Sequence, residues 1–251
     1  MDIVRRLRAA GCVFAEDEAA LLHEAAQSPD DLERMVLRRI AGTPLELILG
    51  WAEFAGLRIL VDPGVFVPRR RTEILVREAV GVARSWAVVL DLCCGTGAVG
   101  AAIAARVAGV ELYAAELEPA AIVNARRNIE PLGGTVLAGD LFAAVPTELR
   151  GRFDLIAVNA PYVPTEAIAL MPPEARDYEP PIALDGGSDG LDFHRRVAAE
   201  ANDWLTPEGT LVIESSERQA PQSAELFVAR GFAARITEWE DVDGTAIVVT
   251  R

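Results

Sequence analysis

The feature that most constrains the fold is an apolar run, Ala87 to Leu90, that leads directly into a glycine-rich segment. Such a run is typical of a strand buried on both faces. The small apolar residues 101–105 that follow the glycines favour a helix. A strand, a glycine-rich turn and a helix form the first crossover of a doubly wound sheet, where missing side chains let a ligand lie against the backbone. An open, mostly parallel α/β sheet is therefore predicted.

Two kinds of ligand suit this turn. Gly95, Gly97 and Gly100 match the G-x-G-x-x-G pattern of dinucleotide-binding folds, although a lone match is a weak signal. Asp91, at the strand end just before the glycines, favours a different ligand. Its carboxylate would repel a pyrophosphate but suits a cationic amino group or, through water, the methionine part of S-adenosylmethionine. We therefore favour the second ligand.

The next two predicted strands, near 110–116 and 135–139, also end in acids. Glu116 lies about 20 residues beyond the glycines, where an acid can bind both hydroxyls of a ribose. Asp140 is placed to accept a hydrogen bond from an adenine amino group. Any one of these acids could instead be a surface carboxylate or a helix cap. Acids at the ends of three successive strands nevertheless favour one shared site.

A fourth apolar run, residues 153–158, is followed by Asn159, Ala160, Pro161 and Tyr162. The Asn159 carboxamide oxygen and the carbonyl of residue 160 offer two acceptors side by side, and Tyr162 offers a flat apolar face. That arrangement suits the NH2 group of a planar amide or an amino-base. An ordinary strand-to-loop turn is the alternative interpretation, because Asn and Pro are common in turns.

The order of these motifs resembles class I S-adenosylmethionine-dependent N-methyltransferases. It is most similar to the HemK-like protein-(glutamine N5) methyltransferases, which modify peptide-chain release factors. The resemblance covers about residues 42–251, and flanking motifs support it: 42–45, 48–50, 53–57, 67–69, 72–73, 179–180, 183–184, 189–191, 207–209, Glu214 and Gln219.

The resemblance implies S-adenosylmethionine as cofactor and an exposed glutamine of a protein as substrate, with a release factor as the leading candidate. Cofactor contacts are implied for these residues: Cys93, Cys94, Gly95, Thr96, Gly97, Glu116, Asp140, Leu141 and Asn159. Catalytic contacts with the substrate are implied for Asn159, Ala160, Pro161 and Tyr162.

The chain departs from the family pattern in three places. Ala160 replaces the first proline of Asn-Pro-Pro-Tyr, which keeps the backbone carbonyl but loses some rigidity. The run 69–71 is Arg-Arg-Arg, which adds two positive charges near the mouth of the site. Only about 40 residues precede Gly42, where the release-factor enzymes carry a longer helical domain.

These departures leave other functions open. An N-methyltransferase of a small-molecule amine or amide, or of a nucleobase, fits the same motifs. A catalytically silent cofactor-binding regulatory module is a further alternative, but the intact Asn159 and Tyr162 argue against it.

The composition of the chain excludes several of the possible functional classes. A net charge of −14 and a pI near 4.6 argue against nonspecific nucleic-acid binding, which needs a basic surface. All 24 basic residues are Arg, which excludes a P-loop kinase and a pyridoxal Schiff-base enzyme, since both need Lys. Two His and three scattered Cys predict no metal site. Few cysteines, no signal peptide and no long apolar stretch predict a cytoplasmic protein without a membrane span.

Three regions are predicted. Residues 1–41 form a short helical substrate-recognition segment with helices at 2–10, 16–27 and 31–40, and residues 42–70 a linker with a hairpin within 44–67. Residues 71–251 form the methyltransferase domain, with a helix at 72–83 and seven strands. The last strands are joined by 241–244, a link so short that the final strand must be antiparallel. The proline-rich, acidic stretch 163–190 is predicted to be a lid or substrate-binding loop.

Overall fold

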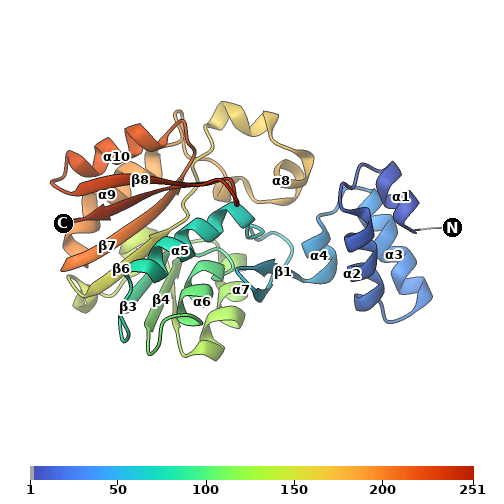
Figure 1. Cartoon of the computed structure of the whole chain (residues 1–251), viewed down its shortest axis with the longest axis horizontal. Coiled ribbons are helices and arrows are strands. Elements are labelled where there is room, and N and C mark those ends of the chain that lie inside the picture. The colour runs from blue at the N-terminus through green and yellow to red at the C-terminus, as the bar shows by residue number, and fades with distance from the viewer. Residues whose placement is uncertain (1–2) are drawn as a thin grey trace.

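The seven predicted strands form one sheet in the computed structural model, which describes residues 3–251 (Figure 1). The sheet order is β5-β4-β3-β6-β7-β9-β8. Strands β3 to β7 pair in parallel, and β9 is antiparallel to both β7 and β8. The strands are β3 (Val88–Leu92), β4 (Glu111–Glu116), β5 (Thr135–Ala138), β6 (Phe153–Val158), β7 (Leu205–Ser215), β8 (Ala233–Trp239) and β9 (Gly244–Thr250). The predicted fold class, with a reversed last strand, is confirmed.

Helices cover both faces of the sheet, which explains why its strands read as continuous apolar runs. Val89 of β3 packs into a core shared with α5, α6 and α7, whereas Leu90 packs into the opposite core with α9 and α10. The helices are α5 (Glu73–Val82), α6 (Ala98–Ala104), α7 (Pro119–Ile129), α9 (Asp192–Trp204) and α10 (Ala220–Val228). Strand β7 begins at Leu205, directly after α9 ends at Trp204.

The N-terminal helices α1 (Ile3–Ala9), α2 (Ala15–Ala25) and α3 (Pro29–Ile40) form a bundle at one end of the molecule (Figure 1). They have their own core, which includes Leu7, Leu22 and Val36. The Ser28 hydroxyl caps α3 by accepting from the Asp31 N–H at 3.2 Å. The three predicted helices are thus confirmed, although Asp2, in the first of them, lies outside the described residues.

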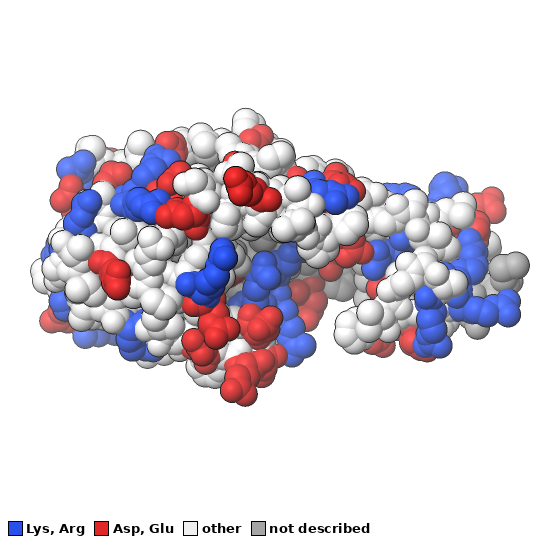
Figure 2. Space-filling view, turned by 90° about the horizontal axis from the view of Figure 1, so that it is seen from above, with Lys and Arg blue, Asp and Glu red and all other residues white. Residues whose placement is uncertain are grey.

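The linker differs from the prediction. A short helix, α4 (Leu45–Leu49), precedes the hairpin of β1 (Trp51–Phe54) and β2 (Leu57–Leu60). The hairpin therefore spans only part of 44–67, because Gly50 at φ 78° ends α4 before the first strand. In the space-filling view a narrow waist joins the N-terminal bundle to the main body, and acidic and basic side chains are mixed on this face (Figure 2).

The segment 163–190 is also more regular than predicted. It contains α8 (Pro173–Tyr178) and two 3-10 turns, Thr165–Leu170 and Pro181–Ala183. It is tied to the N-terminal bundle by Arg39, whose Nη1 contacts Glu174 at 2.5 Å, and to the linker by Thr43, whose hydroxyl lies 3.4 Å from that of Tyr178. Within residues 3–251, no helix is both long and apolar enough to cross a bilayer.

Candidate active site

A cavity of about 330 Å³ opens at the carboxyl ends of β3, β4 and β6. Strand β3 lies between β4 and β6, so this is the point where the chain reverses its direction of crossover, the usual ligand site of such sheets. All but one of the predicted site residues line the cavity: Asp91, Cys93, Cys94, Gly95, Thr96, Glu116, Asp140, Leu141, Asn159, Ala160, Pro161 and Tyr162.

Gly97 is the exception, because it lies outside the cavity lining. It precedes α6 with φ 78°, and a Cβ there would stand 2.6 Å from the Ile129 side chain of α7. The close packing of α6 against α7 therefore favours glycine at this position, and the predicted cofactor contact of Gly97 stays a prediction.

Asp91 ties the end of β3 to the following helix. Its Oδ2 accepts from the Gly100 N–H at 2.8 Å, and the side chain is buried. Burial raises the pKa of Asp91 to about 7; the Gly100 N–H opposes this shift, and the negative charge of Glu116 adds to it. A nearby cation would favour the ionised form, as expected for a carboxylate beside a positively charged ligand group.

Glu116 holds the glycine-rich turn in place. Its Oε2 accepts from the Gly95 N–H at 2.8 Å, and its Oε1 accepts from the Leu117 and Glu118 N–H groups at 2.8 and 3.0 Å. A carboxylate has about four acceptor positions, so it retains capacity for a further donor such as a ribose hydroxyl.

Asp140 lines the same cavity. It follows β5, the outermost parallel strand of the sheet. Its Oδ2 is ion-paired with Arg196 Nη2 of α9 at 2.6 Å, and the pair is half-exposed. The next residue, Leu141, is buried at φ 49°, a left-handed conformation that is costly for a residue with a side chain.

Cys93 and Cys94 behave as thiols that pack in the turn. Burial raises the pKa of both well above the usual range, and the nearby acids raise it further. Both groups therefore stay protonated and poorly reactive at neutral pH. Among residues 3–251, no group of three His, Cys, Asp or Glu is arranged to hold a metal ion.

This half of the cavity fits a nucleoside with a cationic side chain. A Cβ on Gly95 would meet open space, so the backbone itself forms the wall there. The carboxylates of Asp91, Glu116 and Asp140 surround it with acceptors. Acceptors for hydroxyl and amino groups, and a negative charge beside a positive one, are what S-adenosylmethionine needs.

The other half of the cavity is built on the turn after β6. The Asn159 Nδ2 donates to Thr72 Oγ1 at 3.3 Å, which leaves its Oδ1 available as an acceptor. Ala160 is buried, and the Tyr162 hydroxyl donates to Glu214 Oε1 at 2.9 Å. Burial, and then the charge of Glu214, raise the pKa of Tyr162 above its usual value. Tyr162 is thus a neutral phenol and not a base.

The arginine run contributes two side chains to the cavity wall, Arg69 and Arg71. Arg69 Nη2 pairs with buried Glu179, and Arg71 Nε lies 3.6 Å from Glu214 Oε1. Of the two extra positive charges predicted near the site, Arg71 lines the cavity and Arg70 does not. The guanidinium groups of Arg69 and Arg71 each face a buried carboxylate.

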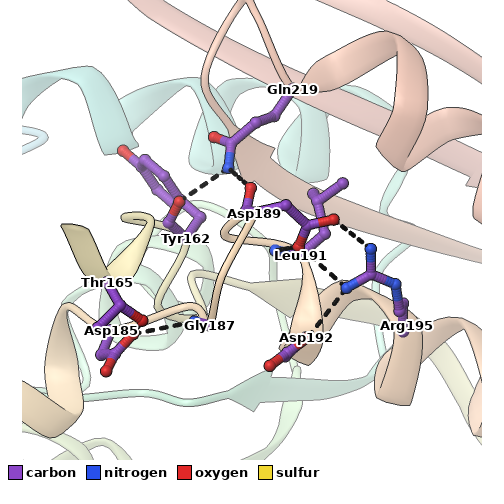
Figure 3. Close-up of polar contacts among 9 residues, drawn as sticks. All are labelled: Tyr162, Thr165, Asp185, Gly187, Asp189, Leu191, Asp192, Arg195 and Gln219. Atoms are coloured by element: carbon purple, nitrogen blue, oxygen red, sulfur yellow. Dashed lines mark hydrogen bonds and ion pairs between the residues drawn. The ribbon is translucent and has the colours of Figure 1, made fainter. Parts of the chain in front are cut away.

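Gln219 fastens the Tyr162 turn to the loop before α9 (Figure 3). Its Nε2 donates to the carbonyls of Tyr162 at 2.9 Å and Asp189 at 2.8 Å. A Cβ on Gly190 would stand 2.2 Å from the same Nε2, so only glycine fits beside it. Arg195 pairs with Asp189 and Asp192, which holds the loop against α9.

Sequence reasoning assigned no role to three residues around this turn: Thr72, Glu214 and Gln219. They stood within motifs of the resemblance, which was the available signal. Their partners lie far away in the chain, so only the folded structure brings them together.

Comparisons with known proteins agree with this geometry. A family model described as "Methyltransferase small domain" matches residues 56–171. A release factor glutamine methyltransferase of Geobacter sulfurreducens is 41% identical, covering 86% of this chain and 75% of the relative. A 4-amino-L-phenylalanine/4-methylamino-L-phenylalanine methyltransferase of Streptomyces pristinaespiralis is 36% identical, covering 82% of this chain and 73% of the relative. The crystal structure of a methyltransferase from Pyrococcus furiosus shares the fold, with a TM-score of 0.58 at 19% identity, over 86% of this chain and 95% of that one.

The fold and the cavity together define a class I S-adenosylmethionine-dependent methyltransferase. Within that class, the chain belongs to the release factor glutamine methyltransferase family. The predictions of enzyme class, cofactor and family are confirmed.

Proposed function

We propose that this enzyme methylates the side-chain amide nitrogen of a glutamine in a protein, with a peptide-chain release factor as the leading substrate. The observation that carries the proposal is the turn after β6, where Asn159 and Tyr162 share one cavity with the predicted cofactor residues. The Asn159 Oδ1 and the Ala160 carbonyl are two acceptors suited to the two N–H groups of a primary amide. The Geobacter sulfurreducens relative is named for the same reaction.

The chemistry requires positioning more than a strong base. An amide nitrogen is a poor nucleophile, because its lone pair is delocalised into the carbonyl. When bound, S-adenosylmethionine supplies an electrophilic methyl group on a positively charged sulfur. Asn159 and the Ala160 carbonyl would hold the amide so that its nitrogen faces that methyl group, while Tyr162 packs on the amide plane. Such positioning supplies several kcal/mol of barrier reduction, up to about 7–11 in ideal cases.

The state of Tyr162 supports this role. Its raised pKa keeps the phenol neutral, and its hydroxyl is already committed to Glu214. Tyr162 therefore presents a ring of fixed orientation to the acceptor.

The three predicted regions enter the proposal as follows. Residues 1–41 would contact the protein substrate, and residues 71–251 would hold the cofactor and the acceptor. Residues 42–70 would join these two regions. The Arg39–Glu174 ion pair supports this division, because it joins the N-terminal bundle to α8, and Glu174 lines the cavity. A protein held by the bundle would thus lie near the cavity mouth. The proposed reaction takes place in the cytoplasm, where translation occurs.

A small-molecule amine is the second candidate acceptor. One observation favours it: the Streptomyces pristinaespiralis relative is named for methylation of an arylamine on an amino acid. The cavity has aromatic and aliphatic walls, including Phe66, Leu184 and Phe193, which suit an aromatic ring. Nucleic acid is disfavoured as a substrate by the net charge of −14.

The test compares these acceptors directly. Purified enzyme and labelled S-adenosylmethionine are incubated in parallel with the organism's release factors, with 4-amino-L-phenylalanine and with RNA. Peptide mass spectrometry then locates the added methyl group. We expect methylation of one glutamine, and none in a release factor in which that glutamine is replaced by alanine. Label that enters only the amine or the RNA would overturn the proposal.

A further inference from the structure

Glu214 is a buried carboxylate at the carboxyl end of β7, behind the turn that carries Asn159 and Tyr162. It is only 2% exposed and lies outside the cavity lining, so it does not itself contact a substrate. We infer that Glu214 is a positioning residue that sets the orientation of both Tyr162 and Asn159. The inference rests on the proposed function, since it concerns how the same site grips its acceptor.

The connection to Tyr162 is direct. The Tyr162 hydroxyl donates to Glu214 Oε1 at 2.9 Å across 52 residues of sequence. Arg71 Nε stands 3.6 Å from the same oxygen. The Tyr162 ring is thus held through its hydroxyl by strand β7.

The connection to Asn159 runs through Thr72. Thr72 is buried, and its interaction with Glu214 lowers the pKa of that carboxyl. The Asn159 Nδ2 donates to Thr72 Oγ1 at 3.3 Å. Glu214 therefore contacts Tyr162 directly, and in our inference the Thr72 hydroxyl links it to Asn159.

When Glu214 is ionised, it gives this chain of bonds its direction. A carboxylate only accepts, so the hydroxyls of Tyr162 and Thr72 must donate to it. The Thr72 oxygen is then left to accept, which selects the NH2 side of Asn159 and leaves Oδ1 free. A glutamine at 214 has both a donor and an acceptor, so it would no longer impose this order. The amide of Asn159 could then rotate and present a donor to the substrate's own N–H.

Burying this charge is costly, which argues that it serves a purpose. Burial raises the pKa of Glu214, and Thr72, Arg71 and Tyr162 oppose that shift. An apolar group of similar size is often neutral or stabilising in such a place. We infer that the purpose of the Glu214 carboxylate is to orient the two acceptor-binding side chains.

The chain contains a matched control. Glu78 is also buried and also contacts an arginine, a threonine and an aromatic residue: Arg235 at 2.5 Å, Thr237 at 3.1 Å and Trp239 at 3.0 Å. It lies on α5 and outside the cavity lining. Glu214→Gln and Glu78→Gln therefore make the same chemical change in similar surroundings, inside and outside the site.

The kinetic test uses the acceptor that the wild-type enzyme methylates. Glu214→Gln is expected to lower kcat by about 10- to 100-fold, the range for losing a hydrogen bond to a charged group, with little change in cofactor KM. Glu78→Gln should leave kcat unchanged. The Glu214→Gln and Tyr162→Phe losses should not multiply in the double variant, because the two residues act as a unit. A wild-type kcat in Glu214→Gln, or losses that multiply, would overturn the inference.

A second measurement needs no acceptor. The side-chain NH2 signal of Asn159 and the ring signals of Tyr162 are assigned by NMR with Asn159→Asp and Tyr162→Phe. Glu214→Gln should move both sets of signals, although Asn159 does not touch Glu214, and Glu78→Gln should move neither. Unchanged chemical shifts for Asn159 would contradict the inference. Changed chemical shifts, together with a wild-type enzyme that does not methylate glutamine, would contradict only the proposed function.

If Glu214→Gln does not fold, Thr72→Val and Tyr162→Phe remove the same bonds from the other side. We expect each to lower kcat, and near-normal kcat in both would also overturn the inference.

Discussion

The two halves of the cavity are held together in different ways. In the cofactor half, the polar contacts of the glycine-rich turn join residues near one another in the chain: Asp91 to Gly100 across nine residues, and Glu116 to Gly95 across 21. Only Asp140, at the edge of this half, has a distant partner, Arg196, 56 residues away. In the acceptor half the contacts span 52 residues from Tyr162 to Glu214 and 87 from Asn159 to Thr72. The glycine-rich turn is thus organised within two βα units, whereas the acceptor half depends on the assembled sheet.

This difference has consequences for behaviour. The glycine-rich turn of the cofactor half needs only β3, β4 and their turns to be in place, so its geometry should survive changes elsewhere. The acceptor half needs β7, the 3-10 turn Arg70–Thr72 and the β6 turn to meet correctly. Substitutions in the acceptor half should therefore affect turnover, and substitutions in the cofactor half should affect affinity and stability.

The largest expected effect is that of Asn159→Ala. It removes the Oδ1 acceptor and the bond to Thr72, and we expect kcat to fall by roughly 10²–10³-fold, the range for removing one oriented polar group from an active site. Cofactor affinity should fall much less. Steady-state kinetics, together with calorimetry using S-adenosylhomocysteine, would measure both. Asn159→Asp, which keeps an acceptor, should retain more activity than Asn159→Ala. Near-normal turnover in Asn159→Ala would contradict both the mechanism and the division of the cavity.

The second prediction concerns Asp91 and pH. Its folded-state pKa of about 7 lies above the ordinary value near 3.8, so the folded protein binds this proton more tightly than the unfolded chain. The resulting stabilisation is complete below about pH 4 and is lost as pH rises through 7. At about 1.4 kcal/mol per pKa unit, the loss is at most about 4 kcal/mol.

Asp91→Asn keeps an acceptor for the Gly100 N–H and should remove this pH dependence. Urea unfolding of both proteins between pH 4 and 8 would measure it, and parallel curves would refute the prediction. If Asp91 faces a cationic part of the cofactor, wild-type cofactor affinity should also rise with pH up to about 7. The amide introduced by Asp91→Asn carries no charge, so the variant should lack that rise.

A smaller effect is expected for Glu116→Ala. Losing charge-assisted bonds to the ribose should weaken cofactor binding by roughly 1.5–3 kcal/mol. Part of that loss will come from the glycine-rich turn, because Glu116 also accepts from the Gly95 N–H. Glu111→Ala, at the other end of β4, is the control and should leave affinity unchanged. Calorimetry with S-adenosylhomocysteine would decide, and equal affinities for wild type and Glu116→Ala would contradict the assignment.

The same comparison explains how much of the molecule could be predicted from sequence. The strands of the sheet and the acids at their ends were visible, because both are local patterns: an apolar run and the residue that follows it. The reversed last strand was also predictable, since 241–244 leaves no room for a crossover. Even the lining of the cavity followed from strand ends, because parallel strands bring their carboxyl ends to one edge.

What could not be predicted depends on contacts between distant segments. The helix Leu45–Leu49 is too short to show a helical period, so it was read as part of a hairpin. The segment 163–190 owes its order to remote partners: Glu174 to Arg39, and Glu179 to Arg69. The packing of Gly97 against Ile129 could not be predicted either, because Ile129 lies on another helix.

The smallest expected effect is that of Ala160→Pro, which restores the usual family residue. Ala160 lies beyond the end of β6, so proline there removes no hydrogen bond of that strand, and the backbone carbonyl remains. Proline also biases Asn159 toward an extended backbone. If the carbonyl is the functional part of residue 160, activity should be retained, and stability should rise by about 0.4–1 kcal/mol because the unfolded chain loses freedom.

Ala160→Gly is the matched change in the opposite direction: it also keeps the carbonyl, but it should cost about 0.5–1 kcal/mol of stability. Thermal unfolding and kcat of the two variants would test this prediction. A larger loss of kcat in Ala160→Pro than in Ala160→Gly would contradict it. Such a loss would show that the acceptor site needs the Ala160 side chain or a backbone conformation that proline cannot adopt.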